Sequence, residues 1–168
     1  MDAANKMPSF GNDMEIDDYS DEPNYLGPCT RCVLFTLENE EYGIQVKKIR
    51  EVLRVGTIRN VAGATFGVLG VINVRGVIVT VVDSRVMFNM PSRKIDDHSR
   101  IIIVELDEER TVGIMVDFVK EVKDIPDDKI EPLSGSKENA SRYIQGIAHF
   151  QDNVIILIDV DNMFMGVE

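Results

Sequence analysis

Two cysteines, Cys29 and Cys32, are the first residues whose types and spacing could do chemistry. A C-x-x-C pair is typical of a redox disulfide or of half a zinc site. A redox pair needs a helix N-terminus to lower the thiol pKa, but here the pair enters an apolar, strand-like run, CVLFTL. A zinc site needs two more ligands, and His98 and His149 are isolated. We interpret Cys32 as a buried residue of a first strand, and expect no metal and no cofactor.

Two aspartates, Asp83 and Asp159, could form a carboxylate pair for acid–base catalysis because they occupy equivalent places in two similar segments. Each also stands immediately before a short apolar segment of helical pattern, where an aspartate caps free backbone N–H groups. We favour the capping role. The sequence has no nucleophile elbow, phosphate-binding loop or H-E-x-x-H helix, so we predict no catalytic residues.

The segments that carry these aspartates are copies of one another. Residues 67–88 read GVLGVINVRGVIVTVVDSRVMF, and residues 146–164 read GIAHFQDNVIILIDVDNMF. They align without a gap, with the turn Arg75-Gly76 over Gln151-Asp152. Upstream, residues 42–52 align with residues 112–122. The body is therefore a duplication of one unit, at about 32–92 and 99–166, each with about five short strands and a short terminal helix.

Five short strands do not form a stable open sheet with both edges bare, and curling into a small barrel is the usual solution. One such unit buries a marginal core, so we expect the two to pack together. The predicted fold is mainly β: two five-stranded, SH3-like barrel subdomains with short helices at the ends.

The first 28 residues differ from the rest, with seven acids against one lysine. We predict a disordered acidic tail at 1–28 and a folded domain at 29–168. The net charge of −11 argues against nucleic acid and against an anionic membrane as partners. No signal peptide and no apolar run of about 20 residues is present, so we expect a cytoplasmic protein without direct membrane insertion.

Aliphatic residues alternate with charges in two equivalent stretches, VKKIREVL and VKEVKDI. Such a strip is either the core face of an amphipathic strand or an exposed groove with a charged rim, which marks a protein-binding surface. The duplication places Ile49 and Val52 in one copy at the positions of Val119 and Val122 in the other.

Four motifs carry a family resemblance, in this order: FTLENEEYGI, GVINVRGVIVTVVDSR, RTVGIMVDFVKEV and YIQGIAHFQDNVIILIDVD. Over about four-fifths of its length the sequence resembles CheW, the scaffold protein of bacterial chemotaxis. The resemblance implies two intertwined SH3-like barrels and no enzymatic activity. It implies an adaptor that couples transmembrane chemoreceptors to the histidine kinase CheA by binding both. Such a protein is recruited to membrane-associated chemoreceptor arrays.

The resemblance also implies site residues. The receptor-binding groove of the family corresponds to Ile49, Val119 and Val122. The family's N-x-R-G motif stands here as Asn73-Val74-Arg75-Gly76, so Arg75 and Gly76 are expected at the receptor-binding site, with Gly70 as the matching glycine before it. Kinase contacts are expected at Glu51 and Ile78. The alternative is a small β-barrel ligand-binding protein or enzyme that uses the cleft between the barrels.

Overall fold

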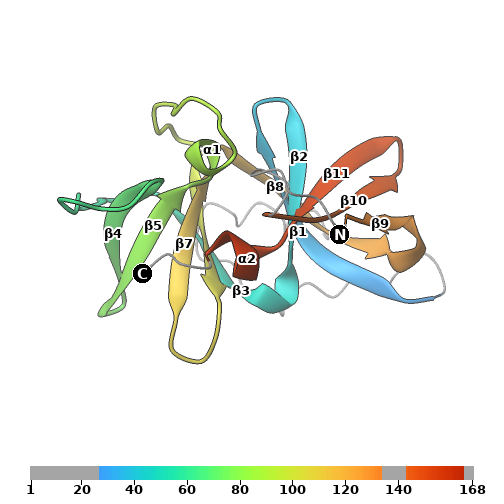
Figure 1. Cartoon of the computed structure of the whole chain (residues 1–168), viewed down its shortest axis with the longest axis horizontal. Coiled ribbons are helices and arrows are strands. Elements are labelled where there is room, and N and C mark those ends of the chain that lie inside the picture. The colour runs from blue at the N-terminus through green and yellow to red at the C-terminus, as the bar shows by residue number, and fades with distance from the viewer. Residues whose placement is uncertain (1–26, 134–142, 165–168) are drawn as a thin grey trace, which may run out of the picture.

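The computed structural model describes residues 27–133 and 143–164. Two curled β-sheets lie side by side, with a short helix, α2 (Val160–Met163), between them (Figure 1). The prediction of a mainly β fold with two subdomains is confirmed. The tail predicted at 1–28 falls almost entirely outside the described residues.

The first sheet has six strands in the order β8-β1-β2-β11-β10-β9. All neighbours are antiparallel except β2 and β11, which are parallel. The sixth strand, β9, is a short addition at one edge. The bounds are β1 (Cys29–Leu37), β2 (Glu40–Gln45), β8 (Phe118–Pro126), β9 (Ile130–Pro132), β10 (Ile144–Phe150) and β11 (Asn153–Ile158).

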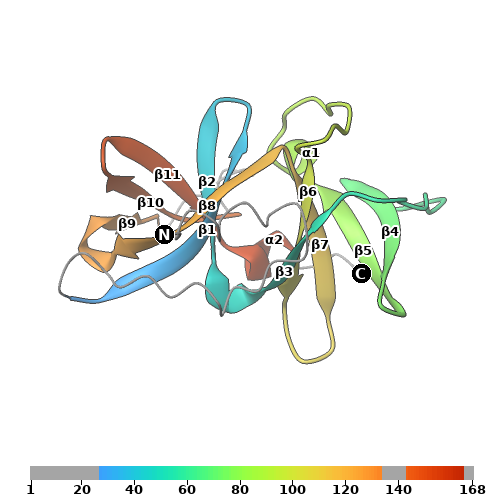
Figure 2. The ribbon, with the colours of Figure 1, turned by 180° about the vertical axis from the view of Figure 1, so that it is seen from behind.

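The second sheet has five strands in the order β3-β6-β7-β5-β4, and its one parallel pair is β5 and β7. Seen from the opposite side, this sheet lies to the right of α2, and β6 is in view (Figure 2). The bounds are β3 (Ile49–Arg54), β4 (Val68–Val74), β5 (Val77–Asp83), β6 (Arg100–Glu105) and β7 (Thr111–Val116). The remaining elements are α1 (Ser84–Met87) and the 3-10 turns η3 (Val46–Lys48) and η4 (Asp127–Lys129).

The two sequence repeats are not the two subdomains. Each repeat gives its first two strands to one sheet and its remaining strands to the other, so that the first sheet takes β1 and β2 from the first repeat and β8 to β11 from the second. The chain crosses between sheets at Val46–Lys48 and crosses back at Asp117. The expectation that each repeat curls into its own barrel is thus wrong, and the intertwining implied by the family resemblance is found.

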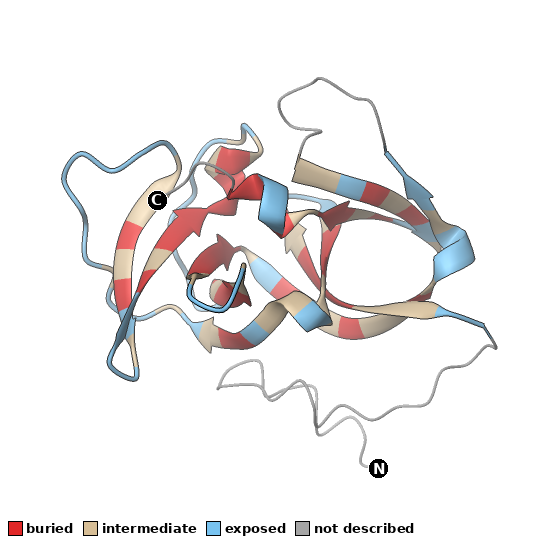
Figure 3. Ribbon diagram, turned by 60° about the horizontal axis from the view of Figure 1, so that its bottom comes forward, coloured by how far each residue is buried: buried red, intermediate tan, exposed pale blue. Residues whose placement is uncertain are grey.

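Three apolar clusters hold this arrangement together. One lies inside each curled sheet, and the largest packs the two sheets against each other. Figure 3 shows buried residues recurring along the strands of both sheets, as expected where alternate side chains face a core. The central cluster draws on both repeats, with Phe35 and Tyr42 stacked at 5.5 Å between ring centroids.

The two copies of the repeat have the same helix cap in the structure. Asp83 accepts a hydrogen bond from the Arg85 amide (3.0 Å), and Asp159 accepts one from the Asn162 amide (3.1 Å). Both aspartates therefore cap a helix, as predicted. The strand register shifts just before Gly70, and a Cβ atom there would lie 2.2 Å from the carbonyl oxygen of Arg59, so only glycine fits.

Candidate functional site

The turn between β4 and β5 is a tight hairpin. Arg75 (φ 51°) and Gly76 (φ 91°) both have positive φ, as a two-residue turn of this kind requires. The Asn73 side-chain oxygen accepts a hydrogen bond from the Gly76 amide at 2.8 Å. The N-x-R-G motif therefore has a structural role: asparagine fixes the turn, and glycine accepts the backbone angle at its second position.

Arg75 forms an ion pair with Glu51 of β3. In the strand order β3 and the β4–β5 hairpin are at opposite ends of the second sheet, so this ion pair joins the two edges across the mouth of the curl. Glu51 is only 6% exposed, whereas the Arg75 side chain is largely in solvent. The structure thus brings together two residues that sequence reasoning assigned to different partners.

Large apolar side chains are exposed beside this turn. Ile78 is 63% exposed, and Val77 is also exposed. Asn73 and Ile78 are cross-strand partners, which places their side chains on the same face of the hairpin. We define the first-turn surface as Asn73, Arg75, Gly76, Val77 and Ile78. Val77 and Ile78 are consecutive strand residues and point to opposite faces, so each face of the hairpin carries one exposed aliphatic side chain beside the turn. An arginine next to exposed aliphatic side chains is a composition suited to a protein partner.

The equivalent turn of the second repeat has the same backbone but different chemistry. Gln151 (φ 54°) and Asp152 (φ 64°) replace arginine and glycine, and Val154 replaces Ile78 as the exposed aliphatic residue. Lys123 of β8 donates a hydrogen bond to the Gln151 side chain at 2.7 Å. In each curled sheet a polar contact joins a hairpin turn to an edge strand: the β4–β5 turn to β3 in the second sheet, and the β10–β11 turn to β8 in the first. The arginine occurs in the first repeat alone.

The three aliphatic residues expected in a receptor groove lie at the central core. Val119 is 4% exposed and Val122 is 1% exposed, and both belong to the cluster that packs the two sheets together. Ile49 packs against the same cluster and is partly exposed. Of the two interpretations of this alternating strip, the core face is the one found for Val119 and Val122. Their partner role stays a prediction, and their side chains do not lie at the surface described here.

A buried charge cluster was missed by sequence reasoning. Arg85 of α1 makes a bidentate contact with Asp117, with Nη2–Oδ2 at 2.7 Å and Nε–Oδ1 at 2.9 Å, and it also reaches Glu38 at 2.8 Å. The hydrogen bonds that Arg85 donates to Asp117 hold the pKa of Arg85 above its usual value. Burial opposes ionisation of Asp117, but the hydrogen bonds from Arg85 and from the Glu38 amide hold its pKa below the usual range. The signal in the sequence was a lone arginine in an apolar helix.

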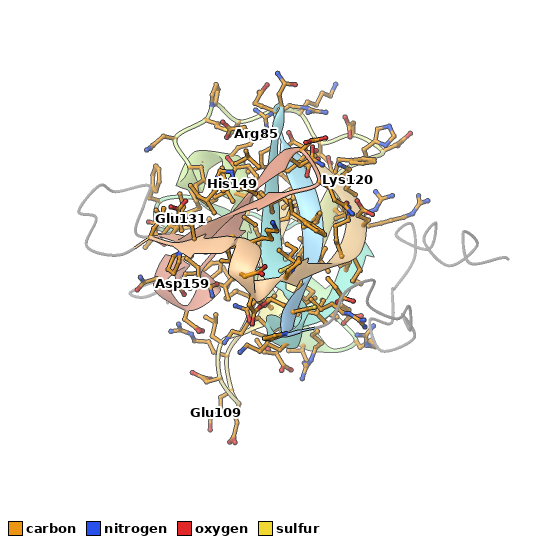
Figure 4. All side chains as sticks on the ribbon, turned by 90° about the vertical axis from the view of Figure 1, so that its right-hand side faces the viewer. Arg85, Glu109, Lys120, Glu131, His149 and Asp159 are labelled. Atoms are coloured by element: carbon orange, nitrogen blue, oxygen red, sulfur yellow. The ribbon has the colours of Figure 1, made fainter. Side chains whose placement is uncertain are left out.

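The cysteines and histidines show no arrangement for chemistry. Cys29 and Cys32 are free thiols three residues apart on β1, where side chains point to opposite faces. Burial raises the pKa of Cys32 to about 12. His149 lies beside Glu131 on neighbouring strands at the surface, 3.7 Å apart (Figure 4). Within residues 27–133 and 143–164, no group of three or more His, Cys, Asp or Glu side chains could hold a metal ion.

A hollow of about 270 Å³ lies where the chain crosses between the sheets. Of its lining charges, Lys48 pairs with Asp161 at 2.9 Å and Asp159 caps α2, whereas Lys47 is exposed. Among the described residues, the helices are too short to cross a membrane.

Comparison with known proteins agrees with this architecture. Residues 31–168 match the family model described as the CheW-like domain. The chain is 31% identical over 137 residues to the chemotaxis protein CheW of Klebsiella aerogenes, covering 81% of this chain and 82% of that one. It is 28% identical over 132 residues to the chemotaxis protein CheW of Bacillus subtilis, with 78% and 84% covered.

A solved structure is similar over most of its length. The scaffolding protein TtCheW from Thermoanaerobacter tengcongensis matches with a TM-score of 0.75 and 32% identity, covering 82% of this chain and 93% of that one. The family-model match, the curated relatives and this structure all point the same way. The chain belongs to the CheW-like family.

Proposed function

We propose that this protein is a non-catalytic chemotaxis adaptor that couples chemoreceptors to the histidine kinase CheA within a signalling array. Membership of the CheW-like family and the likeness to a scaffolding protein support the adaptor role. The observation that carries the finer proposal is the first-turn surface, where exposed Ile78 follows the Arg75-Gly76 turn and exposed Val77 lies on the other face of the hairpin. Such an adaptor works in the cytoplasm and is recruited to the receptor arrays.

The kinase contact is proposed at Ile78, with Glu51 acting through Arg75. Ile78 presents a free aliphatic side chain, of the kind that anchors a protein interface when a partner desolvates it. Glu51 is buried, so it positions Arg75 rather than touching a partner itself.

The receptor contact is proposed at Ile49 together with the turn residues Arg75 and Gly76. Ile49 is the member of the predicted groove that is partly exposed. Val119 and Val122 belong to the same central cluster and support Ile49 from within. Gly70 keeps the hairpin in place by admitting the Arg59 backbone.

Co-sedimentation with receptor-containing membranes and CheA tests this proposal. The unmodified protein is expected in a ternary complex that changes the kinase activity. Ile78→Asp should weaken the affinity for the kinase at least tenfold, because the substitution places a charge in an apolar contact from which the partner excludes water. Val154→Asp, at the equivalent exposed position of the second repeat, is the matched control and should leave the binary complex with the kinase intact. If neither receptor nor kinase binds the unmodified protein, the adaptor proposal is wrong.

A further inference from the structure

Two equivalent ion pairs hold the short helices, and their polarity is reversed. In the first, Arg85 of α1 pairs with Asp117 at the crossing between β7 and β8. In the second, Asp161 of α2 pairs with Lys48 at the crossing between β2 and β3. Positions 85 and 161 coincide in the repeat, and position 117 coincides with 47, beside Lys48. In the first ion pair the helix carries the positive charge and the crossing the negative one. In the second ion pair the helix carries the negative charge and the crossing the positive one.

Each of these ion pairs joins the two halves of the chain. Arg85 belongs to the first half (29–92) and Asp117 to the second (99–164), and the same holds for Lys48 and Asp161. A crossing follows directly on a hairpin, β1–β2 or β6–β7. The charge on each helix therefore forms an ion pair only if the hairpin in its sheet comes from the other half and is followed by a crossing of opposite charge.

The hairpin of a repeat cannot pair with the remaining strands of the same repeat. In the first sheet β2 and β8 flank β1 and are both antiparallel to it. For β3 to take the place of β8, the three residues of η3 would have to cross two strand spacings, about 9.6 Å, and also run back along β1. Three residues extend to about 10 Å at most. The connection is too short, so each hairpin must be accepted by strands of another repeat.

That other repeat could belong to a second copy of the chain. The two halves share strand order, and three of their five pairs of equivalent strands agree in length to within one residue, so a first half could exchange hairpins with another first half, and a second half with another second half. Such exchange of like halves would place Arg85 against Lys47 and Lys48. It would also place Asp117 against Asp161.

The burial of the first ion pair makes this exchange costly. The Arg85 side chain is 5% exposed and that of Asp117 is 12% exposed. Arg85 would lose Asp117, the bidentate one of its two carboxylate partners, and Asp117 would lose Arg85. A buried charge that loses an ion-pair partner is destabilising, and a like charge in its place adds repulsion. Lys48 and Asp161 are more exposed and contribute less on their own.

We propose that the reversed ion pairs Arg85–Asp117 and Lys48–Asp161 direct hairpin exchange to the opposite half of the same chain and suppress exchange between like halves of two chains. An exchange between opposite halves of two chains keeps both ion pairs and is not opposed by this device. The proposal does not depend on the adaptor function.

Refolding of the full chain tests the device. The reversed variant carries three substitutions: Lys47→Asp, Lys48→Asp and Asp161→Arg. It keeps the second ion pair but exchanges its charges, so that both helices are positive, both crossings are negative, and either helix can pair with either crossing. The three positions lie at or near the surface, where substitution is compatible with folding. The matched control, Lys47→Gln, Lys48→Gln, Asp161→Asn, removes the second ion pair and adds no attraction. Each protein is refolded from urea at low and high concentration and its mass is measured by light scattering after size exclusion.

The reversed variant is expected to give several-fold more dimer than the unmodified protein, rising with protein concentration during refolding and persisting on dilution. The neutral control should match the unmodified protein, because Arg85 and Asp117 still oppose exchange of like halves. If the reversed variant refolds to as little dimer as the unmodified protein, or the neutral control dimerises as much as the reversed variant, the proposal is overturned.

Discussion

Arg75, at the turn of one hairpin, pairs with Glu51 on the strand at the far edge of the same sheet. The pair closes the curl of the second sheet, much as the contact between Lys123 and Gln151 closes the first. The ion pair also couples the exposed Arg75 guanidinium to the buried Glu51 carboxylate. A partner that moves Arg75 leaves Glu51 without its counter-charge, so the geometry of β3 is linked to occupancy of the first-turn surface.

A double-mutant cycle measures this unit. Arg75→Ala and Glu51→Gln should each lower the free energy of unfolding, and the combined variant should lose less than the sum. We expect a coupling energy of about 1 kcal/mol, because solvent screens the exposed arginine even though the carboxylate is buried. Urea unfolding followed by circular dichroism gives the four values. Additive losses would mean that the ion pair contributes nothing in solution.

Val122 and Ile78 should respond to the same substitution in opposite ways. Val122→Asp puts a charge into the central core and should cost roughly 4 kcal/mol or prevent folding. Ile78→Asp replaces an exposed side chain, and its unfolding midpoint should stay close to that of the unmodified protein. A Val122→Asp protein that is folded and stable would show that the two sheets separate to expose this position.

Two glycines near the first turn should differ in their tolerance of a methyl group. Gly70→Ala drives a Cβ atom into the Arg59 carbonyl and breaks the two backbone hydrogen bonds between Arg59 and Val71, with an expected loss of about 3 kcal/mol. Gly76→Ala meets nothing within 4 Å and carries only the strain of positive φ, about 1 kcal/mol. Thermal denaturation of both variants gives the order, and the reverse order would contradict the close approach seen at Gly70.

The two cysteines should be distinguishable by alkylation. Cys29 is partly exposed, whereas Cys32 is buried and its pKa is raised from 9.0 to about 12. One thiol should react in the native protein at pH 8, and two should react in urea. The same shift lowers stability as pH rises, because between about pH 9 and pH 12 the unfolded chain loses a proton that the native protein keeps. Mass spectrometry of the alkylated protein that found both thiols modified without denaturant would contradict the burial of Cys32.

The sequence predicted the strands, the turns and the caps well because these are local. The caps predicted at Asp83 and Asp159 are both present, and the aligned glycines Gly70 and Gly146 each follow a register shift that was not predicted. It could not show which strands share a sheet, since residue patterns within a repeat are the same whether the hairpin stays or leaves. The short crossings, at Val46–Lys48 and Asp117, were the available clue.

The site was predicted less completely than the fold. The alternation of aliphatic and charged residues identified the apolar strip, but it did not show whether the strip is buried or exposed. Val119 and Val122 are buried, although the charges beside them suggested the rim of an exposed groove. The contact between Arg75 and Glu51 joins residues far apart in the strand order, which no local pattern reveals. Ile78, the second residue after the Arg75-Gly76 turn, was named from the family resemblance.

Reciprocal exchange of hairpins sets the order in which the protein can be completed on the ribosome. The second sheet has all its strands once Val116 has emerged, since it needs nothing beyond β7. The hairpin β1–β2 is the first to be synthesised, yet its parallel neighbour β11 ends at Ile158. At about 5 to 20 residues per second that hairpin waits several seconds for its last partner. During synthesis the middle of the chain can fold first, and the N-terminal strands are among the last to be enclosed.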